Sequence, residues 1–413
     1  MHRNQRILII VENLTMPLDR RVWTEAQTLR DAGYTVSVIC PKAGEYTKSY
    51  EVLDGIHVFR HPQPFEADGA FGYALEYANA LFWEFVLSIW VWFKVGFDVV
   101  QACNPPDLIF IVGGFWKYLF GKPFIFDHHD INPELFEAKF SKRGVFHSLL
   151  KVFERWTFKT ADVSLATNET FKEIAVARGG MDSSRVYVVR SVPDLSKFRR
   201  ISPSTTLKND RKYLIGYVGV MGAQDGVDLL IQAMADVVHG QGRQDIQCAI
   251  VGSGTELERL KAMAQDFGVN DYVTFTGFLS GTDLLAAYST FDVGVIPDPK
   301  NSYNDKISMN KVFEYMAMGI GFVQFDLIEG RRAAGESSLY AADNNPLDLS
   351  NKLLQLVDDR ELRGRLGSIG MERARALLNW DNERIRLLNA YEMVLEDGRV
   401  VVDVNAVSAT QQP

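Results

Sequence analysis

The pattern that most constrains the fold of this chain is a regular alternation of short apolar segments with amphipathic helical segments. This alternation is typical of βαβ units and predicts parallel sheets with helices between the strands. Strands are predicted at residues 6–11, 35–40, 57–60, 99–102, 124–127, 163–166 and 186–189, and in a second series at 213–219, 247–251, 273–276, 293–296, 322–325 and 338–341. The sequence therefore predicts an α/β fold with two Rossmann-like sheets.

A polar, turn-rich segment at residues 201–211 separates the two series and is predicted to connect two domains. Two domains are also expected from the length, because 413 residues exceed what one hydrophobic core usually supports. The predicted N-terminal domain spans 1–200 and the C-terminal domain spans 201–380. A helix at 381–398 is expected to pack back towards the N-terminal domain, and 399–413 is expected to be a flexible tail.

The composition is that of a globular protein, with 47% hydrophobic and 23% charged residues. A formal net charge of −8 argues against a nucleic-acid partner. Cys40, Cys103 and Cys248 lack the spacing of metal ligands, so buried thiols in a reducing compartment are expected. The N-terminal residues lead straight into a short apolar run without a recognisable cleavable signal, which predicts a cytoplasmic location.

A helix is predicted within residues 308–319, after the strand at 293–296. It carries Lys311 and, about one turn later, Glu314. A carboxylate here can accept both hydroxyls of a ribose, while a lysine and the free N–H groups at the helix start, near Asn310, can hold a diphosphate. An ordinary amphipathic helix with Lys311 and Glu314 as a solvated ion pair explains the same pattern equally well.

The stretch Lys311-Val-Phe-Glu-Tyr-Met-Ala-Met-Gly resembles the signature of retaining glycosyltransferases of family 4, in which a glutamate at this place binds the donor ribose. Further segments resemble the donor domain of that family or the opening of its bacterial exopolysaccharide transferases, namely 249–256, 273–279, 286–297, 17–26 and 126–135. The resemblance implies the GT-B fold, in which two Rossmann-like domains face each other across a cleft. It assigns the ribose contact to Glu314.

The same resemblance implies the reaction. A hexose would move from a nucleotide-diphosphate sugar, a co-substrate, to a lipid-linked or polysaccharide acceptor in cell-surface polysaccharide synthesis, with retained anomeric configuration and without a metal or other cofactor. The acceptor would lie on the N-terminal domain and the donor on the C-terminal domain. Because diphosphate is already a good leaving group, the chemistry chiefly requires stabilisation of its negative charge.

His129 is the catalytic candidate of the N-terminal domain. It follows the strand at 124–127, where the resemblance places a histidine near the transferred sugar, and a loop histidine that caps a helix is the alternative. The adjacent His128 is expected to point in a different direction, and no third metal ligand lies at a recognisable spacing, so no metal site is assigned.

Arginines and glycines supply the other donor-binding candidates. Arg20 and Arg190 are candidate partners of the diphosphate, with a hinge-region salt bridge as the alternative for Arg190. For Arg21, a surface ion pair with Asp19 or Glu25 is as well supported as a ligand role. Backbone N–H groups around Gly219 and Gly222 are expected to help, and Gly252 lies in a turn that is either near the nucleotide base or purely structural.

Two departures from the family pattern stand out. After the strand at 213–219 many members carry an arginine and a lysine that clamp the diphosphate, whereas this chain has Met221-Gly-Ala-Gln-Asp-Gly. Charge neutralisation must then fall on Lys311, Lys306 or the candidate arginines. Lys306 also stands where the family has the first glutamate of a pair, so it joins His129 and Lys311 as a catalytic candidate.

An aromatic block at residues 80–95 predicts peripheral contact with the inner face of the cell membrane. Aromatic and basic residues together suit the headgroup region of an anionic membrane, and 146–156 adds basic residues to the aromatic ones. A buried core helix is the alternative. Glu84 interrupts the block, which is also shorter than the ~20 apolar residues that a spanning helix needs.

Three classes of function stay open on the sequence alone. The first is the glycosyltransferase, the second a nucleotide-sugar epimerase or hydrolase of GT-B fold, and the third a donor-binding partner without catalysis. Lys306 and the missing clamp motivate the third.

Overall fold

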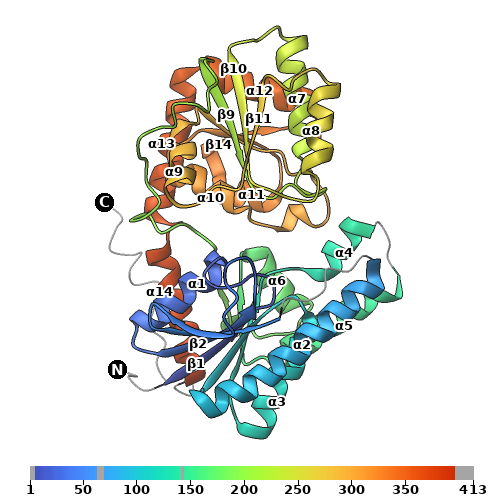
Figure 1. The fold of residues 1–413 in the computed structure, drawn as a ribbon, viewed down its shortest axis with the longest axis vertical. Coiled ribbons are helices and arrows are strands. Elements are labelled where there is room, and N and C mark those ends of the chain that lie inside the picture. Colours follow the sequence, from blue (N-terminus) through green and yellow to red (C-terminus); the bar gives the residue numbers. More distant parts are fainter. Residues whose placement is uncertain (1–4, 63–68, 141–143, 396–413) are drawn as a thin grey trace. The chain divides into compact units, whose positions relative to one another are not determined.

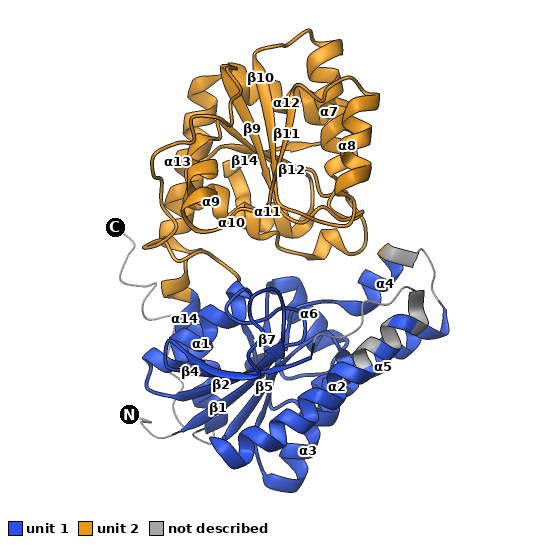
Figure 2. Ribbon diagram, viewed as in Figure 1, with its two compact units in different colours: residues 1–137, 141–190, 383–413 blue, residues 138–140, 191–382 orange. Residues whose placement is uncertain are grey.

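The computed structural model describes residues 5–62, 69–140 and 144–395 (Figure 1). The chain forms two compact units, each an α/β domain around its own sheet (Figure 2). The first unit comprises residues 1–137, 141–190 and 383–413, and the second comprises 138–140 and 191–382. The tail expected at 399–413 lies outside the described residues.

The first unit is built on an eight-stranded sheet with the order β3-β4-β2-β1-β5-β6-β7-β8. Its strands are β1 (Arg6–Ile10), β2 (Thr35–Pro41), β3 (Tyr50–Leu53), β4 (Ile56–His61), β5 (Val99–Cys103), β6 (Phe124–His128), β7 (Val163–Ala166) and β8 (Val186–Val188). Its helices are α1 (Arg20–Asp31), α2 (Gly69–Lys94), α3 (Phe110–Phe120), α4 (Asn132–Phe140), α5 (Val145–Thr160) and α6 (Glu169–Ala177). Neighbouring strands are parallel except β3, which pairs antiparallel with β4.

The second unit contains a six-stranded sheet with the order β11-β10-β9-β12-β13-β14, and its paired strands are parallel. Its strands are β9 (Tyr213–Val218), β10 (Ile246–Val251), β11 (Val273–Gly277), β12 (Val293–Ile296), β13 (Phe322–Phe325) and β14 (Ser338–Ala341). Its helices are α7 (Val227–Ala235), α8 (Leu257–Asp266), α9 (Gly281–Thr290), α10 (Asn310–Ala317), α11 (Ile328–Ala334), α12 (Pro346–Asp358) and α13 (Arg360–Ala376). The two-sheet α/β fold predicted from the sequence is confirmed.

Every predicted strand coincides with an observed strand, but the prediction missed β3. Asp54 and Gly55 have φ of 48° and 78° and join β3 to β4 as a two-residue hairpin turn. An Asp-Gly pair between two strand-like runs is a strong hairpin signal. The segment before it, Tyr50–Leu53, has only four residues, includes the charged Glu51 and has no fully buried residue, so it lacks the longer apolar run that identified the other strands.

The connection between the units differs from the predicted one. The units divide after Arg190, and the polar segment that begins at Ile201 belongs to the second unit. The backbone N–H of Ile201 donates to Ser289 Oγ at 3.0 Å, and that of Ser204 donates to Thr290 Oγ1 at 2.8 Å. These bonds tie the segment to the end of α9.

The C-terminal helix, α14 (Trp380–Leu395), passes from the second unit into the first at Glu383. Within the first unit, Glu383 pairs with Arg190, and Met393 Sδ accepts a hydrogen bond from Tyr187. Residues 396–398, which were expected to extend this helix, lie outside the described residues.

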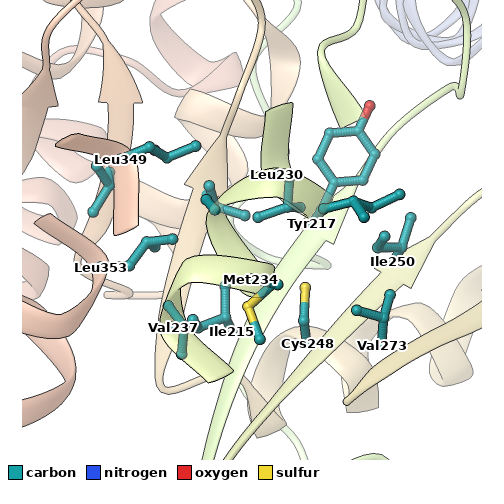
Figure 3. Close-up of a cluster of buried hydrophobic side chains, with 14 of the residues drawn as sticks. Ile215, Tyr217, Leu230, Met234, Val237, Cys248, Ile250, Val273, Leu349 and Leu353 are labelled. Atoms are coloured by element: carbon teal, nitrogen blue, oxygen red, sulfur yellow. The ribbon is translucent and has the colours of Figure 1, made fainter. Parts of the chain in front are cut away.

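A buried apolar cluster forms the core of the second unit, as Figure 3 shows. It joins residues from the strands β9, β10 and β11 to residues from the helices α7 and α12, and includes Ile215, Leu230, Met234, Cys248, Ile250, Val273, Leu349 and Leu353. All six residues of β10 are buried, which is typical of a central strand in a parallel sheet covered on both faces. The apolar residues from which these strands were predicted are therefore the ones that form this core.

None of the helices in the described part of the chain combines the length and the apolar character that a membrane crossing requires. Cys40, Cys103 and Cys248 are free and buried, as expected for structural thiols.

Candidate active site

In the second unit, α10 brings Lys311 to the carboxyl ends of the central strands. Lys311 is 7% exposed, and its Nζ donates to Asp298 Oδ2 at 2.8 Å in the segment after β12. Nζ also lies 4.8 Å from the centre of the Tyr217 ring, at the end of β9. Burial alone would lower the pKa of Lys311, but the carboxylates of Asp298 and Asp225 outweigh it and raise the pKa. Lys311 is thus a buried, charged ammonium rather than half of a solvated pair.

The predicted glycines form close turns beside this ammonium. Gly252 has a φ of +141°, and a Cβ there would lie 1.9 Å from the carbonyl oxygen of Gly219. A Cβ on Gly219 would lie 3.5 Å from Lys311 Nζ, so the turns after β9 and β10 meet next to the lysine. Gly222 donates its backbone N–H to Asp225 Oδ2 at 2.8 Å. The structure thus brings Gly219 and Gly252 together beside Lys311, whereas the N–H of Gly222 is held by a carboxylate.

Asp225 lies in the turn where the family pattern predicts a diphosphate clamp. Burial raises its pKa to about 6, although Lys311 opposes the shift and Asp298 adds to it. Asp225 and Asp298 together place two acidic groups around one lysine. Any anion that approaches Lys311 therefore meets a cation that is already largely neutralised.

Glu314 lies one turn after Lys311 on α10 and is half-buried. Its Oε2 accepts a short hydrogen bond from the hydroxyl of Tyr288, which is fully buried on α9. The two predicted residues therefore differ in environment. Lys311 is buried and pairs with a buried acid, whereas the half-buried carboxylate of Glu314 accepts a hydrogen bond from a buried tyrosine. A carboxylate held in this way is suited to accept hydrogen bonds from a diol.

Lys306 and Asn310 lie on the segment that joins β12 to α10. Lys306 is half-buried and ends a short 3-10 turn, η4 (Asn304–Lys306), while Asn310 is exposed at the first position of α10. The side-chain amide of Asn304 donates to the carbonyls of Gln224 and Pro299, at 2.9 Å each. These bonds attach the Lys306 turn to the turn that contains Gly222.

In the first unit, the polar groups at the carboxyl ends of β5 and β6 form a buried network. The Arg21 guanidinium lies 2.8 Å from Asp127 Oδ1 and 3.2 Å from Glu25 Oε1, and it donates to the carbonyl of Val189 at 2.6 Å. Its side chain is 8% exposed, so the expected surface ion pair with Glu25 is instead a buried one. The reason is that Arg21 and Glu25, one turn apart on α1, share the helix face that packs towards the sheet.

The pKa values of the two carboxyl groups in this network shift in opposite directions. Burial, and then the neighbouring Asp127, raise the pKa of Glu25. Burial would also raise the pKa of Asp127, but Arg21 and His129 outweigh it and lower the pKa. Burial and Asp127 thus favour the protonated form of Glu25, whereas Arg21 and His129 favour the ionised form of Asp127.

His129 belongs to this network, and His128 does not. His129 Nε2 lies 2.7 Å from Asp127 Oδ2 and 3.1 Å from Arg21 Nε, and its backbone N–H donates to Asn104 Oδ1. Burial would lower its pKa, but Asp127 outweighs burial and raises it. His128 is buried on the other side against Phe158 and Phe171, and burial lowers its pKa to about 3. The expected divergence of the two histidines is confirmed.

Asp127, His129 and Cys103 are close enough to hold a metal ion, but their chemistry points to another cation. Their ligand atoms lie within 4.8 Å of one another. Arg21 Nε lies 3.4 Å from Asp127 Oδ2 and 3.1 Å from His129 Nε2, so a guanidinium already lies against both groups. Burial raises the pKa of the Cys103 thiol well above its usual range, which disfavours the thiolate.

The other two arginine candidates, Arg190 and Arg20, are described by their own surroundings. Arg190 is 3.3 Å from Glu383 and 3.0 Å from Glu169, which is the salt bridge given as the alternative to a diphosphate contact. Arg20 is exposed at the first position of α1.

Comparisons with known proteins agree with this geometry. The model described as Glycosyltransferase Family 4 matches residues 18–197, and the model described as Glycosyl transferases group 1 matches 212–359. The sucrose-phosphate synthase of Thermosynechococcus elongatus superposes with a TM-score of 0.78 at 18% identity, over 95% of this chain and 100% of that chain. This chain is a family 4-like glycosyltransferase of the GT-B fold.

Other relatives of the glycosyltransferase are similarly distant. An uncharacterized glycosyltransferase of Methanocaldococcus jannaschii is 22% identical over 85% of this chain and 88% of its own length. The mannosylfructose-phosphate synthase of Agrobacterium fabrum is 23% identical over 66% of this chain, which spans only 59% of that enzyme. The structure of Anabaena HepE in complex with UDP and glucose has a TM-score of 0.70 at 15% identity, over 94% of this chain and 99% of HepE.

Sequence reasoning missed several residues of the glycosyltransferase that hold the candidates in place. Asp127 and Gln101 are buried polar residues inside the otherwise apolar strands FIFDH and VVQAC, and that interruption of an apolar run was a usable signal. Asp298 and Tyr288 had no comparable signal, because their roles depend on contacts with α10, 13 and 26 residues away.

Proposed function

We propose that this glycosyltransferase moves a hexose from a nucleotide-diphosphate sugar to a lipid-linked or polysaccharide acceptor, with retention, in cell-surface polysaccharide synthesis. One observation carries the donor assignment: α10 brings Lys311 to the glycine turns after β9 and β10, and presents Glu314 one turn later. Ligands of open α/β sheets bind at the carboxyl ends of the strands. The UDP and glucose in the HepE structure support a nucleotide-sugar donor.

The chemistry that we propose for the second unit is stabilisation of the leaving diphosphate. Lys311, the N-terminus of α10 and the backbone around Gly219 would face its charge, and Lys306 would add a second cation. Glu314 would accept the hydrogen bonds of the ribose hydroxyls. No cofactor enters this scheme, because the leaving phosphate itself can take the acceptor's proton.

We further propose that His129 acts on the sugar or acceptor side. With Nε2–H donated to Asp127 at 2.7 Å, the imidazole presents Nδ1 as a hydrogen-bond acceptor. Asp127 would both fix this tautomer and stabilise a protonated ring. A hydroxyl of the substrate is the natural donor to Nδ1.

The proposed membrane contact rests on exposed apolar residues on three helices of the first unit. On α2, Phe82 is 59% and Phe93 is 82% exposed, whereas Glu84 is buried. Helices α2 and α3 contact each other, as do α3 and α5. A cavity of ≈ 430 Å³ at α3 and α5 is lined by Phe110, Ile111, Gly114, Phe115, Tyr118, Trp156, Lys159 and Thr160.

Helix α5 adds charge to this surface. Lys151, Arg155 and Lys159 are exposed at intervals of four residues and form a basic stripe. A second stripe of exposed apolar residues runs along the same helix, namely Val145, Leu149, Val152 and Trp156. In a protein with a net charge of −8, this pairing of basic and apolar stripes suits an anionic lipid surface.

Vesicle co-sedimentation tests the membrane contact. We expect the protein to bind vesicles that contain anionic lipid, and to lose most of this binding in the variant Lys151→Ala/Arg155→Ala/Lys159→Ala. Replacing three exposed lysines of the second unit, Lys197, Lys212 and Lys261, is the matched control. Equal binding of both triple variants would contradict the assignment of the surface to α5.

A donor screen tests the transfer reaction. Thermal-shift measurements against a panel of UDP- and GDP-sugars should identify one stabilising donor. Turnover of that donor should rise strongly with a lipid-linked or polysaccharide acceptor, and NMR of the product should show the anomeric configuration of the donor. An inverted product would contradict retention.

A donor-binding protein without catalysis is the second candidate, favoured by the two acids around Lys311. Tight donor binding without turnover, for any acceptor tested, would support it. An isomerised or free sugar formed without acceptor would instead indicate an epimerase or hydrolase.

A further inference from the structure

We propose that Tyr391, on the C-terminal helix, is a positioning residue for His129, acting through Gln101 and Asp127. The proposal rests on the proposed role of His129. It assigns to α14 a part in the catalytic apparatus of the first unit, in addition to the helix's packing.

The contacts form a continuous chain of buried side chains. Tyr391 is fully buried, and its hydroxyl donates a short hydrogen bond to Oε1 of Gln101, also fully buried on β5. The amide Nε2 of Gln101 donates to Glu25 Oε2 at 2.8 Å and to Asp127 Oδ2 at 3.2 Å. The same oxygen of Asp127 lies 2.7 Å from His129 Nε2.

The tyrosine hydroxyl decides which way the Gln101 amide faces. A primary amide has an acceptor end and a donor end, and the two neighbouring acids need the donor end. Burial raises the pKa of Tyr391 well above its usual range, so its hydroxyl stays protonated and donates its hydrogen to the amide oxygen of Gln101. A flipped amide would place its oxygen against two carboxyl groups, and it would leave buried polar atoms unpaired.

The amide in turn restricts Asp127. Asp127 Oδ1 is held by Arg21 at 2.8 Å. Oδ2 faces His129 Nε2 at 2.7 Å and also accepts from Gln101 at 3.2 Å, from Arg21 Nε at 3.4 Å and from the Cys103 thiol at 3.7 Å. Without the Gln101 donor, the carboxylate loses one of the bonds that hold Oδ2 in line with the imidazole. His129 would then no longer be confined to the Nε2–H tautomer.

The charged groups around His129 are consistent with this dependence. Asp127, Arg21 and Asp19 act on the imidazole, and Asp127 makes the largest favourable contribution to its protonated form. Arg21 Nε also approaches His129 Nε2 at 3.1 Å and would favour the opposite tautomer, with the proton on Nδ1. The orientation of Asp127 therefore decides between two competing hydrogen bonds.

The test is the variant Tyr391→Phe, which removes only the hydroxyl. Tyr187→Phe is the matched control, because the Tyr187 hydroxyl donates to Met393 Sδ on the same helix and lies outside the network. Nitrogen-15 NMR of labelled histidine reports the tautomer of His129 in its neutral form. We expect the Nε2–H tautomer in the wild type and in Tyr187→Phe, and a mixture in Tyr391→Phe.

Kinetics provide the second readout. With the donor found by the screen, we expect Tyr391→Phe to lower kcat about 3- to 10-fold, the effect of one neutral hydrogen bond, with an unchanged KM for the donor. Equal kcat values for both tyrosine variants would overturn the proposal. An Nδ1–H tautomer in the wild type would overturn it as well.

A second variant keeps the test decisive if Tyr391→Phe folds poorly. Gln101→Met removes the amide at similar size, and it should produce the same tautomer mixture. Adding Tyr391→Phe to Gln101→Met should then change neither tautomer nor kcat further. The two proposals can fail separately. Wild-type turnover by His129→Ala would overturn the proposed role of His129 in sugar transfer. The tautomer measured by NMR does not depend on turnover, so it would still decide whether Tyr391 positions His129.

Discussion

The two units hold their polar groups in different ways at equivalent places, the carboxyl ends of parallel strands. In the second unit the site consists of backbone turns, one helix start and two side chains of α10, with Glu314 half-buried. In the first unit, side chains from α1, β5, β6 and α14 bond to one another in the interior. In the proposed reaction, the second unit exchanges hydrogen bonds with the donor, whereas the network of the first unit keeps one imidazole in place.

This difference has an energetic consequence. A buried network loses several partners when one member is removed, so its members should affect folding and catalysis together. A half-buried side chain that faces a ligand should affect binding more than folding. The predictions below test this contrast.

The largest effect is expected for Asp127→Ala. It leaves the buried guanidinium of Arg21 without its nearest carboxylate, at 2.8 Å, and should cost about 3–5 kcal/mol in the free energy of unfolding. Urea denaturation measures this cost. Asp31→Ala is the matched control in the same unit, since Asp31 pairs with Arg30 at an exposed position and should cost at most about 1 kcal/mol. If both aspartate variants lost the same free energy of unfolding, the buried network of the first unit would not be the special stabilising feature that we describe.

Glu314→Ala should weaken donor binding about 10- to 100-fold, because a charged hydrogen bond to a hydroxyl contributes about 1.5–3 kcal/mol. Calorimetric titration with the donor from the screen measures the loss. The free energy of unfolding should fall by about 1–2 kcal/mol, because the buried Tyr288 hydroxyl loses its acceptor. Glu336→Ala, an exposed glutamate of the same unit, should change neither donor affinity nor stability. Unchanged donor affinity would refute the ribose contact.

Buried acids of the first unit should make stability depend on pH. Burial, and then Glu12, raise the pKa of Glu84 from an ordinary 4.5 to about 8. The folded state then binds a proton that the unfolded state releases, so stability falls as pH rises from about 4.5 to 8, with a slope of up to about 1.4 kcal/mol per pH unit. The variant Glu84→Gln has no carboxyl group at this position and therefore lacks this pH dependence. Its advantage over the wild type in urea denaturation should therefore grow between pH 5 and 8, and a constant difference would contradict the shift.

The smallest effect concerns Asp225, the acid beside Lys311. Because its pKa is about 6, Asp225 is ionised at pH 7.5 and would repel a diphosphate, whereas at pH 5 it is largely neutral. Asp225→Asn should tighten donor binding a few-fold at pH 7.5 and leave it unchanged at pH 5. Asp228→Asn, on the first turn of α7, is the control. If the wild type and Asp225→Asn bound the donor equally well at both pH values, Asp225 would not interact with the diphosphate.

The same contrast explains what could be predicted from the sequence. The helix with Lys311 and Glu314, and the glycines after β9 and β10, are contiguous motifs, and the structure brings Lys311, Gly219 and Gly252 together. The network around Asp127 draws on residues up to 290 positions apart, which no local pattern records. The sequence therefore left Arg21 open between a surface ion pair and a ligand role, and the acids that surround Lys311 went unnoticed.

The central claim is that the second unit binds the donor and the first unit acts on what is transferred. Binding of the matching nucleoside diphosphate, measured by calorimetry for Glu314→Ala and His129→Ala beside acceptor-dependent turnover, tests it most directly. We predict that Glu314→Ala loses nucleotide affinity, while His129→Ala keeps wild-type affinity and loses turnover. Nucleotide binding that survives in Glu314→Ala and disappears in His129→Ala would contradict the account.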